Sequence, residues 1–197
     1  MEPIGARRSV SIAARKSRER AERERRITAA ARQLAEAEGW NAVTVRRLAE
    51  KIEYSQPVLY SHFENRDAIV AAVALEGFAD LTLALRRAAE GSTGHRDALT
   101  KVATAYLAFA REHPAVYEAM FTMPTNLRFA KVDTRTELKE AFATLASVVA
   151  PSRHDVEIAT ETFWAALHGL AELEHSGRIR RGPRDERVAL VVRALLD

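Results

Sequence analysis

Residues 44–66 read TVRRLAEKIEYSQPVLYSHFENR and contain two short segments with helical character. The apolar positions of the first segment follow the i, i+3, i+4, i+7 spacing of one helix face: Val45, Leu48, Ala49 and Ile52. This spacing predicts a helix over 45–52, and a proline near the start of the second segment fits a helix over 56–62. Thr44 and Ser55 immediately precede these helices, so we expect them to be the N-caps.

Helices of only two turns are not stable alone, so both must pack on a third helix. We expect that third helix at 18–38, where Ile27, Ala31 and Leu34 recur on one face. Leu59 and Phe63 of the second segment would pack against the same face. Helix, three-residue turn and helix form the helix-turn-helix arrangement.

The second short helix keeps a small, polar face outside this packing. A recognition helix enters the major groove of DNA by its N-terminal end, where glutamine can pair with adenine and valine can contact a thymine methyl group. The side chains expected at base edges are Arg46, Ser55, Gln56 and Val58. The residues expected to hold phosphates are Thr44, Val45, Tyr60, His62 and Arg66.

Basic residues are concentrated in the N-terminal third of the chain. Residues 1–66 hold 14 Lys and Arg against 9 Asp and Glu, a net charge of +5, whereas the remaining residues carry −2 of the total of +3. Such a charge distribution favours a polyanionic partner. Charge alone fits equally well a solvated tail or a segment on an anionic membrane. We expect residues 1–17 to be a flexible basic arm whose Arg7 and Arg8 contact a minor groove or phosphates.

These residues also carry a family resemblance, which covers about residues 22–70. The chain resembles the DNA-binding region of TetR-family transcriptional regulators in the following elements: Gly39-Trp40, Thr44-Val45-Arg46-Arg47-Leu48-Ala49, Ser55-Gln56-Pro57-Val58-Leu59-Tyr60-Ser61-His62-Phe63 and Asn65-Arg66. The resemblance implies base-reading positions for Arg46, Gln56 and Val58. It implies phosphate positions for Thr44, Tyr60, His62 and Arg66.

One residue departs from the family pattern. Glu53 stands where these regulators usually have a turn glycine. If the backbone there is left-handed, glutamate costs roughly 1 kcal/mol more than glycine. We therefore expect an adjusted turn.

The whole chain is predicted to be all-α. The expected helices are 18–38, 45–52, 56–62, 66–89, 96–112, 114–122, 127–149, 153–175 and 185–196. They form an N-terminal three-helix helix-turn-helix domain, joined by a long helix to a C-terminal helical ligand-binding and dimerisation domain. The predicted domains are a basic arm at 1–17, a DNA-binding domain at 18–66 and the C-terminal domain at 67–197.

The last two helices are apolar nearly all round, which indicates more than one packing partner. The family resemblance implies a homodimer built by these helices as a four-helix bundle, bound to a pseudo-palindromic operator. The expected interface residues are Leu167, Leu170, Leu173, Val188, Val191, Val192 and Leu195. The alternative is that these side chains are buried within one chain.

Trp164, His168 and Gly169 form a Trp-x-x-x-His-Gly element that resembles the WHG-domain subfamily of these regulators. A glycine inside a helix suggests close approach by another helix or a ligand. The resemblance implies a small, mainly apolar effector, and the candidate lining residues are Tyr106, Phe109, Tyr117, Met120, Phe121, Phe163, Trp164 and His168. Read residue by residue, the same side chains fit an ordinary core.

Other classes of function find less support. The chain has no cysteine, which excludes thiol catalysis and thiolate metal sites. It has no H-E-x-x-H, glycine-rich phosphate loop or G-x-S-x-G motif, so we expect no enzyme and no cofactor or metal. The longest aliphatic run, residues 68–75, is far shorter than the ~20 residues of a membrane span. We therefore expect a cytoplasmic transcriptional regulator, most often a repressor in this family, that a ligand releases from its operator.

Overall fold

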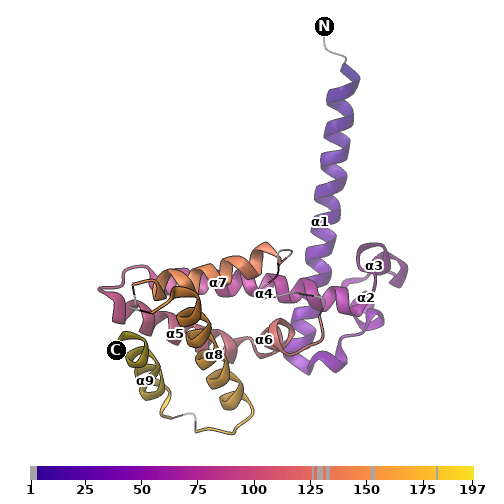
Figure 1. Cartoon of the computed structure of the whole chain (residues 1–197). Coiled ribbons are helices and arrows are strands. Elements are labelled where there is room, and N and C mark those ends of the chain that lie inside the picture. Colours follow the sequence, from indigo (N-terminus) through magenta and orange to yellow (C-terminus); the bar gives the residue numbers. More distant parts are fainter. Residues whose placement is uncertain (1–3, 126, 128–130, 132–133, 152–153, 181) are drawn as a thin grey trace. The chain divides into compact units, whose positions relative to one another are not determined.

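The computed structural model describes residues 4–125, 127, 131, 134–151, 154–180 and 182–197, with side chains from residue 12 onward. Over these residues the chain is helical with no strand, so the all-α prediction is confirmed. Figure 1 shows the helices, and their contacts divide the chain into two units, Met1–Val73 and Ala74–Asp197. The division lies inside one long helix, further along the chain than the boundary expected after Arg66.

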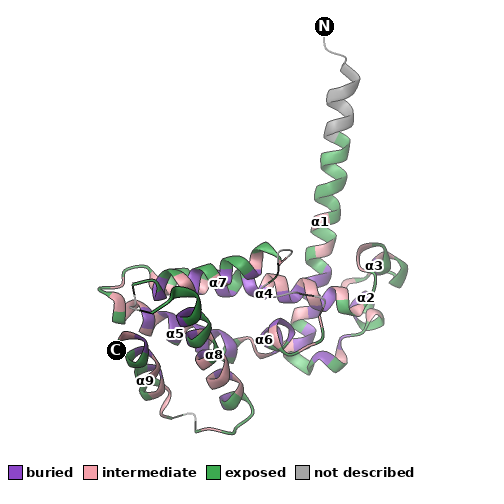
Figure 2. Cartoon of the chain, viewed as in Figure 1, coloured by how far each residue is buried: buried purple, intermediate pink, exposed green. Residues whose placement is uncertain are grey.

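The first unit contains the predicted helix-turn-helix. Its elements are α1 (Ile4–Glu38), the short 3-10 helix η1 (Trp40–Ala42), α2 (Val45–Ile52), α3 (Gln56–His62) and the beginning of α4 (Arg66–Ala89). The structure gives α2, α3 and α4 the predicted bounds. Ile27 and Ala31 of α1, Leu48 of α2 and Leu59 of α3 are almost completely buried, as expected. Figure 2 shows these buried faces beside exposed outer faces.

The structure corrects the start of the first helix. The sequence prediction begins it at residue 18, whereas α1 begins at Ile4, so residues 4–17 of the expected flexible arm have a helical backbone. The reason is that no glycine or proline interrupts residues 6–38, and the Arg15–Glu19 and Arg20–Glu24 ion pairs support the helix at i, i+4 spacing. The side chains of Arg7 and Arg8 lie outside the described ones, so their contacts with DNA stay a prediction.

The turn between α2 and α3 keeps the left-handed geometry despite its glutamate. Glu53 has φ 58° and ψ 39°. Its N–H donates to the Glu50 carbonyl at 3.4 Å, and the Tyr54 N–H donates to the Ala49 carbonyl at 2.9 Å. The expected adjustment of the turn is therefore absent, and the exposed Glu53 bears the backbone strain.

We expect Glu53→Gly to stabilise the chain by about 0.5–1 kcal/mol, because glycine adopts this backbone without the Cβ penalty. Urea unfolding measures the change. Glu53→Ala is the matched control, since alanine keeps a Cβ and should give no such gain. Equal stability of the Gly and Ala variants would contradict the strain.

The second unit is built around one central helix. The second half of α4 is followed by α5 (His95–Glu112), α6 (Pro114–Phe121), α7 (Thr136–Val149), α8 (Val156–His175) and α9 (Arg184–Leu196). Four helices, α6, α7, α8 and α9, pack on α5. Leu99, Tyr106 and Phe163 are among the fully buried side chains of the second unit. α5, α6, α8 and α9 match the predicted helices to within three residues at each end.

α7 is shorter than predicted. The expected start at residue 127 is wrong, because the helix begins at Thr136. Lys131 and Thr134 form a local turn in which the Lys131 N–H donates to Thr134 Oγ1 at 2.9 Å. Several residues between 127 and 135 lie outside the described ones.

Two glycines of the second unit have opposite surroundings. A Cβ at Gly169 would meet nothing within 4 Å, so the close approach expected at this glycine is not found in the single chain. A Cβ at Gly77 would lie 2.5 Å from Val116 Cγ1 and 2.7 Å from Met120 Sδ. The close approach of two helices at a glycine therefore occurs between α4 and α6.

α4 is also both long and apolar. Its length and a mean hydropathy of 1.9 over 18 residues would permit it to cross a membrane, although no segment this apolar was expected. Half of that stretch is buried inside the structure. Val70 and Val73 in the first unit, and Leu81 and Leu85 in the second, are buried core residues. Its apolar character thus matches a core helix.

Candidate functional site

The N-terminal end of α3 is exposed, while its opposite side is held in the core. Leu59 is 1% exposed, and it fixes the orientation of the helix. Ser55, Gln56 and Pro57 are exposed, and Tyr60 is 54% exposed. Ser55 precedes the helix in extended backbone, but its hydroxyl makes no capping bond, so its expected capping bond is absent. These side chains can meet an external partner.

The beginning of α2 lies in the same helix-turn-helix and is capped as predicted. Thr44 Oγ1 accepts a hydrogen bond from the Arg47 N–H at 3.2 Å. Arg46 is exposed, and its Nε donates to Glu50 Oε1 at 2.9 Å, which raises the pKa of the Arg46 guanidinium. Because exposed pairs of this kind are weak, Arg46 can exchange Glu50 for another acceptor at little cost.

Two of the predicted phosphate contacts also have partners within the first unit. Arg66 Nε donates to the Val43 carbonyl at 2.8 Å, and its Nη2 donates to the Trp40 carbonyl at 2.6 Å. The His62 side chain is 6% exposed, with Nδ1 3.4 Å from Glu24 Oε1 on α1. Both groups therefore brace the helix-turn-helix from within. The Arg66 side chain is still 34% exposed, and the phosphate contacts of both residues stay predictions.

The structure also shows a contact that the sequence did not indicate. Arg26 Nη1 donates to the Tyr54 hydroxyl at 2.9 Å, and the guanidinium lies 5.0 Å from the centre of the Tyr54 ring. Tyr54 belongs to the turn directly before α3. The pair ties α1 to that turn, and 28 residues of separation leave no local signal for it.

We expect Arg66→Ala to destabilise the chain by about 2–4 kcal/mol, because two charge-assisted hydrogen bonds to the Val43 and Trp40 carbonyls are lost. Arg47→Ala is the matched control: Arg47 is paired with Glu38 on the surface and should cost under about 1 kcal/mol. Chemical unfolding of both variants measures the difference. Equal, small losses would contradict the bracing role of Arg66.

The second unit contains an apolar cavity of about 50 Å³. It is lined by Phe78, Leu81, Leu85, Tyr106, Phe121, Leu138, Ala141, Phe142, Leu145 and Trp164. Of the predicted lining residues, the structure brings Tyr106, Phe121 and Trp164 to this cavity. The contributions of α4 and α7, which include Phe78 and Phe142, were missed.

A chain of hydrogen bonds leads from the cavity wall toward α6 and α8. Trp164 Nε1 donates to the Tyr106 hydroxyl at 3.1 Å, the Tyr106 and Tyr117 hydroxyls lie 2.9 Å apart, and the Tyr117 hydroxyl lies 2.6 Å from His168 Nδ1. Burial raises the pKa of both tyrosines and lowers that of His168, although Glu172 opposes the shift of the histidine. These shifts favour neutral side chains in the chain of hydrogen bonds.

The remaining predicted lining residues are core. Phe109, Met120 and Phe163 are buried and do not line the cavity. A second hollow, of about 330 Å³, shares Leu138, Phe142 and Trp164 with the cavity. Its other lining residues are polar or charged: Lys131, Thr134, Lys139, Glu157 and Glu161.

The predicted interface residues divide between core and surface. The buried ones, at most 7% exposed, are Leu167, Val188, Val192 and Leu195. Leu170 and Val191 are half-buried, and Leu173 is 38% exposed. The sequence prediction missed Ile158 and Leu190, which are 65% and 55% exposed. The outer faces of α8 and α9 therefore retain apolar side chains.

Two family models match the chain. Residues 27–73 match the model for bacterial regulatory proteins of the tetR family, and residues 99–196 match the tetracyclin repressor-like C-terminal domain. The N-terminal match contains α2, α3 and most of the resemblance seen in the sequence. The WHG-domain assignment of the C-terminal part is not confirmed by these matches.

Individual relatives agree with these models. An uncharacterized HTH-type transcriptional regulator of Mycobacterium tuberculosis is 31% identical over 142 residues, which are 71% of this chain and 64% of that relative, so the match spans just under two thirds of its length. A protein of unknown function from Rhodococcus sp. RHA1 has a TM-score of 0.72 at 26% identity, covering 88% of this chain and 92% of its own.

A TetR variant from Acinetobacter baumannii, solved in complex with minocycline, has a TM-score of 0.63 at 17% identity. The likeness covers 86% of this chain and 92% of that one. At this identity it shows a common fold.

Proposed function

This chain belongs to the TetR family of bacterial regulatory proteins, and from that membership we propose that it is a sequence-specific DNA-binding transcriptional regulator. The observation that carries the proposal is the exposed N-terminal end of α3, held in place by the buried Leu59. An element with one side fixed and a polar end free is what major-groove recognition requires. The net charge of +5 over residues 1–66 supplies attraction to phosphates.

Base reading and phosphate binding fall to different side chains. Gln56 can pair bidentately with adenine, Val58 can contact a thymine methyl group, and Ser55 and Arg46 lie near the same end. Thr44, Val45 and Tyr60 hold the backbone in register. His62 and Arg66 complete the proposed phosphate contacts, and their contacts inside the first unit fix where they lie.

We place a second copy of the chain on the outer faces of α8 and α9. Ile158, Leu173 and Leu190 are exposed there, and Gly169 leaves open space beside them on α8. Apolar side chains that one chain leaves exposed gain most from a partner that covers them. A twofold dimer would present two α3 helices to a pseudo-palindromic site in the cytoplasm.

We assign a small, mainly apolar effector to the apolar cavity beside Tyr106 and Trp164 together with the hollow of about 330 Å³ that shares Leu138, Phe142 and Trp164 with it. The bound minocycline of the Acinetobacter TetR offers a parallel on the same fold. A ligand that prefers one arrangement of the chain must change its affinity for DNA by the same factor, through thermodynamic linkage. We assign repression, relieved by this ligand, as the outcome.

We expect Gln56→Ala to reduce the preference for duplexes selected from a random library over scrambled DNA by about 1–3 kcal/mol, since a base contact is lost. Tyr60→Phe should weaken the binding of both kinds of duplex alike, because a phosphate contact carries no sequence information. Fluorescence anisotropy at fixed salt measures both affinities. Gln33→Ala, an exposed glutamine change on α1, is the matched control for Gln56→Ala and should leave both affinities unchanged.

Equal losses in Gln56→Ala and Tyr60→Phe would contradict the division between base reading and phosphate binding. A wild-type chain that binds no duplex even at low salt would overturn the function itself.

A further inference from the structure

A hollow of about 200 Å³ lies between α5, α6, α8 and α9, with lining residues different from those of the effector cavity. Its lining combines apolar and charged side chains: Leu107, Ala110, Arg111, Pro114, Ala171, Glu174, His175 and Arg184. Leu107, Ala110 and Ala171 are buried, so one part of the hollow is apolar. Nothing in the proposed function uses this site.

One wall of the hollow is a buried cluster of one acid and two bases. Glu174 on α8 is 7% exposed, and its carboxylate accepts hydrogen bonds from Arg184 Nε at 2.9 Å and Arg187 Nη1 at 3.0 Å. The two arginine side chains on α9 are only 20% and 21% exposed. Arg187 also donates to the Arg180 carbonyl, which is neutral. The cluster therefore retains one positive charge in excess.

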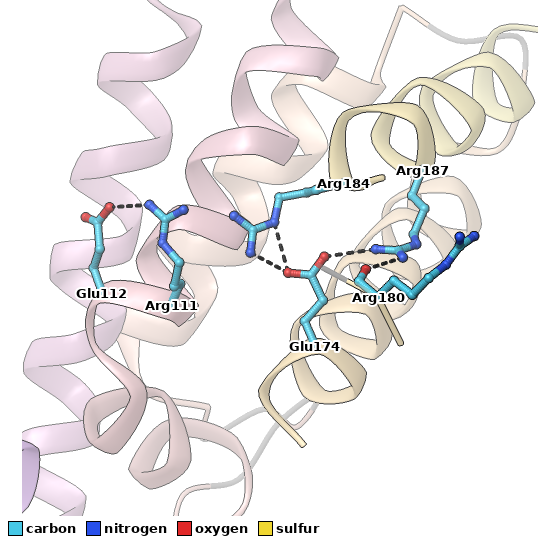
Figure 3. A network of polar contacts seen from close by, with 6 residues as sticks. All are labelled: Arg111, Glu112, Glu174, Arg180, Arg184 and Arg187. Atoms are coloured by element: carbon cyan, nitrogen blue, oxygen red, sulfur yellow. Dashed lines mark hydrogen bonds and ion pairs between the residues drawn. The ribbon is translucent and has the colours of Figure 1, made fainter. Parts of the chain in front are cut away.

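A further arginine, Arg111, lines the same hollow. Figure 3 shows Arg111 directed to Glu112 and Arg184 directed to Glu174. Arg111 is paired with the neighbouring Glu112 at 2.8 Å, and both side chains are 58% exposed. That pair is at the surface, so it leaves the guanidinium able to take a second acidic partner. Two guanidinium groups, one exposed and one largely buried, therefore line one hollow.

Buried positive charge is costly unless an anion compensates it. A carboxylate placed between Arg111 and Arg184 would receive charge-assisted hydrogen bonds from two planar guanidinium groups. A hydrocarbon body attached to it would lie against Leu107, Ala110 and Ala171, the apolar part of the lining, which an inorganic anion would not match. We propose that this hollow binds a small organic carboxylate.

The test is equilibrium dialysis of the full chain against radiolabelled benzoate at neutral pH and constant ionic strength. We expect one benzoate per chain, and Arg111→Gln should weaken its binding about tenfold through the loss of a charge-assisted hydrogen bond. Arg111 is exposed and its ion pair is with the equally exposed Glu112, so this variant should keep its fold. Arg193→Gln, an exposed arginine change on α9, is the matched control and should bind benzoate as the wild type does.

Benzyl alcohol, which has the ring but no charge, should not displace benzoate. Displacement by benzyl alcohol, or equal binding by Arg111→Gln and wild type, would indicate that benzoate binds at an apolar site instead. Either result would overturn the proposal. Loss of binding in Arg46→Gln of the first unit would assign the benzoate to the DNA-facing arginines instead. A site that takes inorganic phosphate and excludes benzoate would also overturn it.

Discussion

The first unit depends on the burial of Leu48 and Leu59 against Ile27 and Ala31 of α1. α2 and α3 have eight and seven residues, too few to persist on their own hydrogen bonds. Each fully buried leucine contributes about 1.5–3 kcal/mol, whereas ordering the backbone of so short a helix costs roughly 7–16 kcal/mol. The leucine therefore offsets part of that cost, and the other contacts of the unit must offset the rest. The same burial decides which end of α3 remains free, so stability and recognition have one origin.

Polar contacts then fix the short helices more closely than apolar packing could. Arg66 joins the start of α4 to the backbone at the beginning of η1 and directly after it. Arg26 joins α1 to Tyr54, and His62 lies against Glu24. Hydrogen bonds have narrow geometric requirements, whereas a hydrophobic contact tolerates rotation. These three contacts hold α3 and the turn before it, and so orient the face that we propose meets the duplex.

The sequence predicted local structure well where the signals are themselves local. The bounds of α2 and α3 follow from apolar spacing, the Thr44 cap and Pro57, and Asn65 caps α4 by accepting from the Ala68 N–H at 2.9 Å. The direction of long side chains is set by packing far along the chain. The hydrogen bonds from Arg66 to the Trp40 and Val43 carbonyls could therefore not be foreseen. The Tyr106–Tyr117–His168 chain of hydrogen bonds could not be foreseen either, from residues up to 62 positions apart.

The central claim is that the leading end of α3 meets the duplex, and hydrogen exchange of the full chain tests it most directly. A helix of seven residues exchanges its amides quickly in the free protein, because little energy separates it from local opening. With a duplex selected from a random library, the account predicts strong protection across 44–62 relative to a scrambled duplex. Unchanged exchange in 44–62, with protection confined to other surfaces, would contradict it.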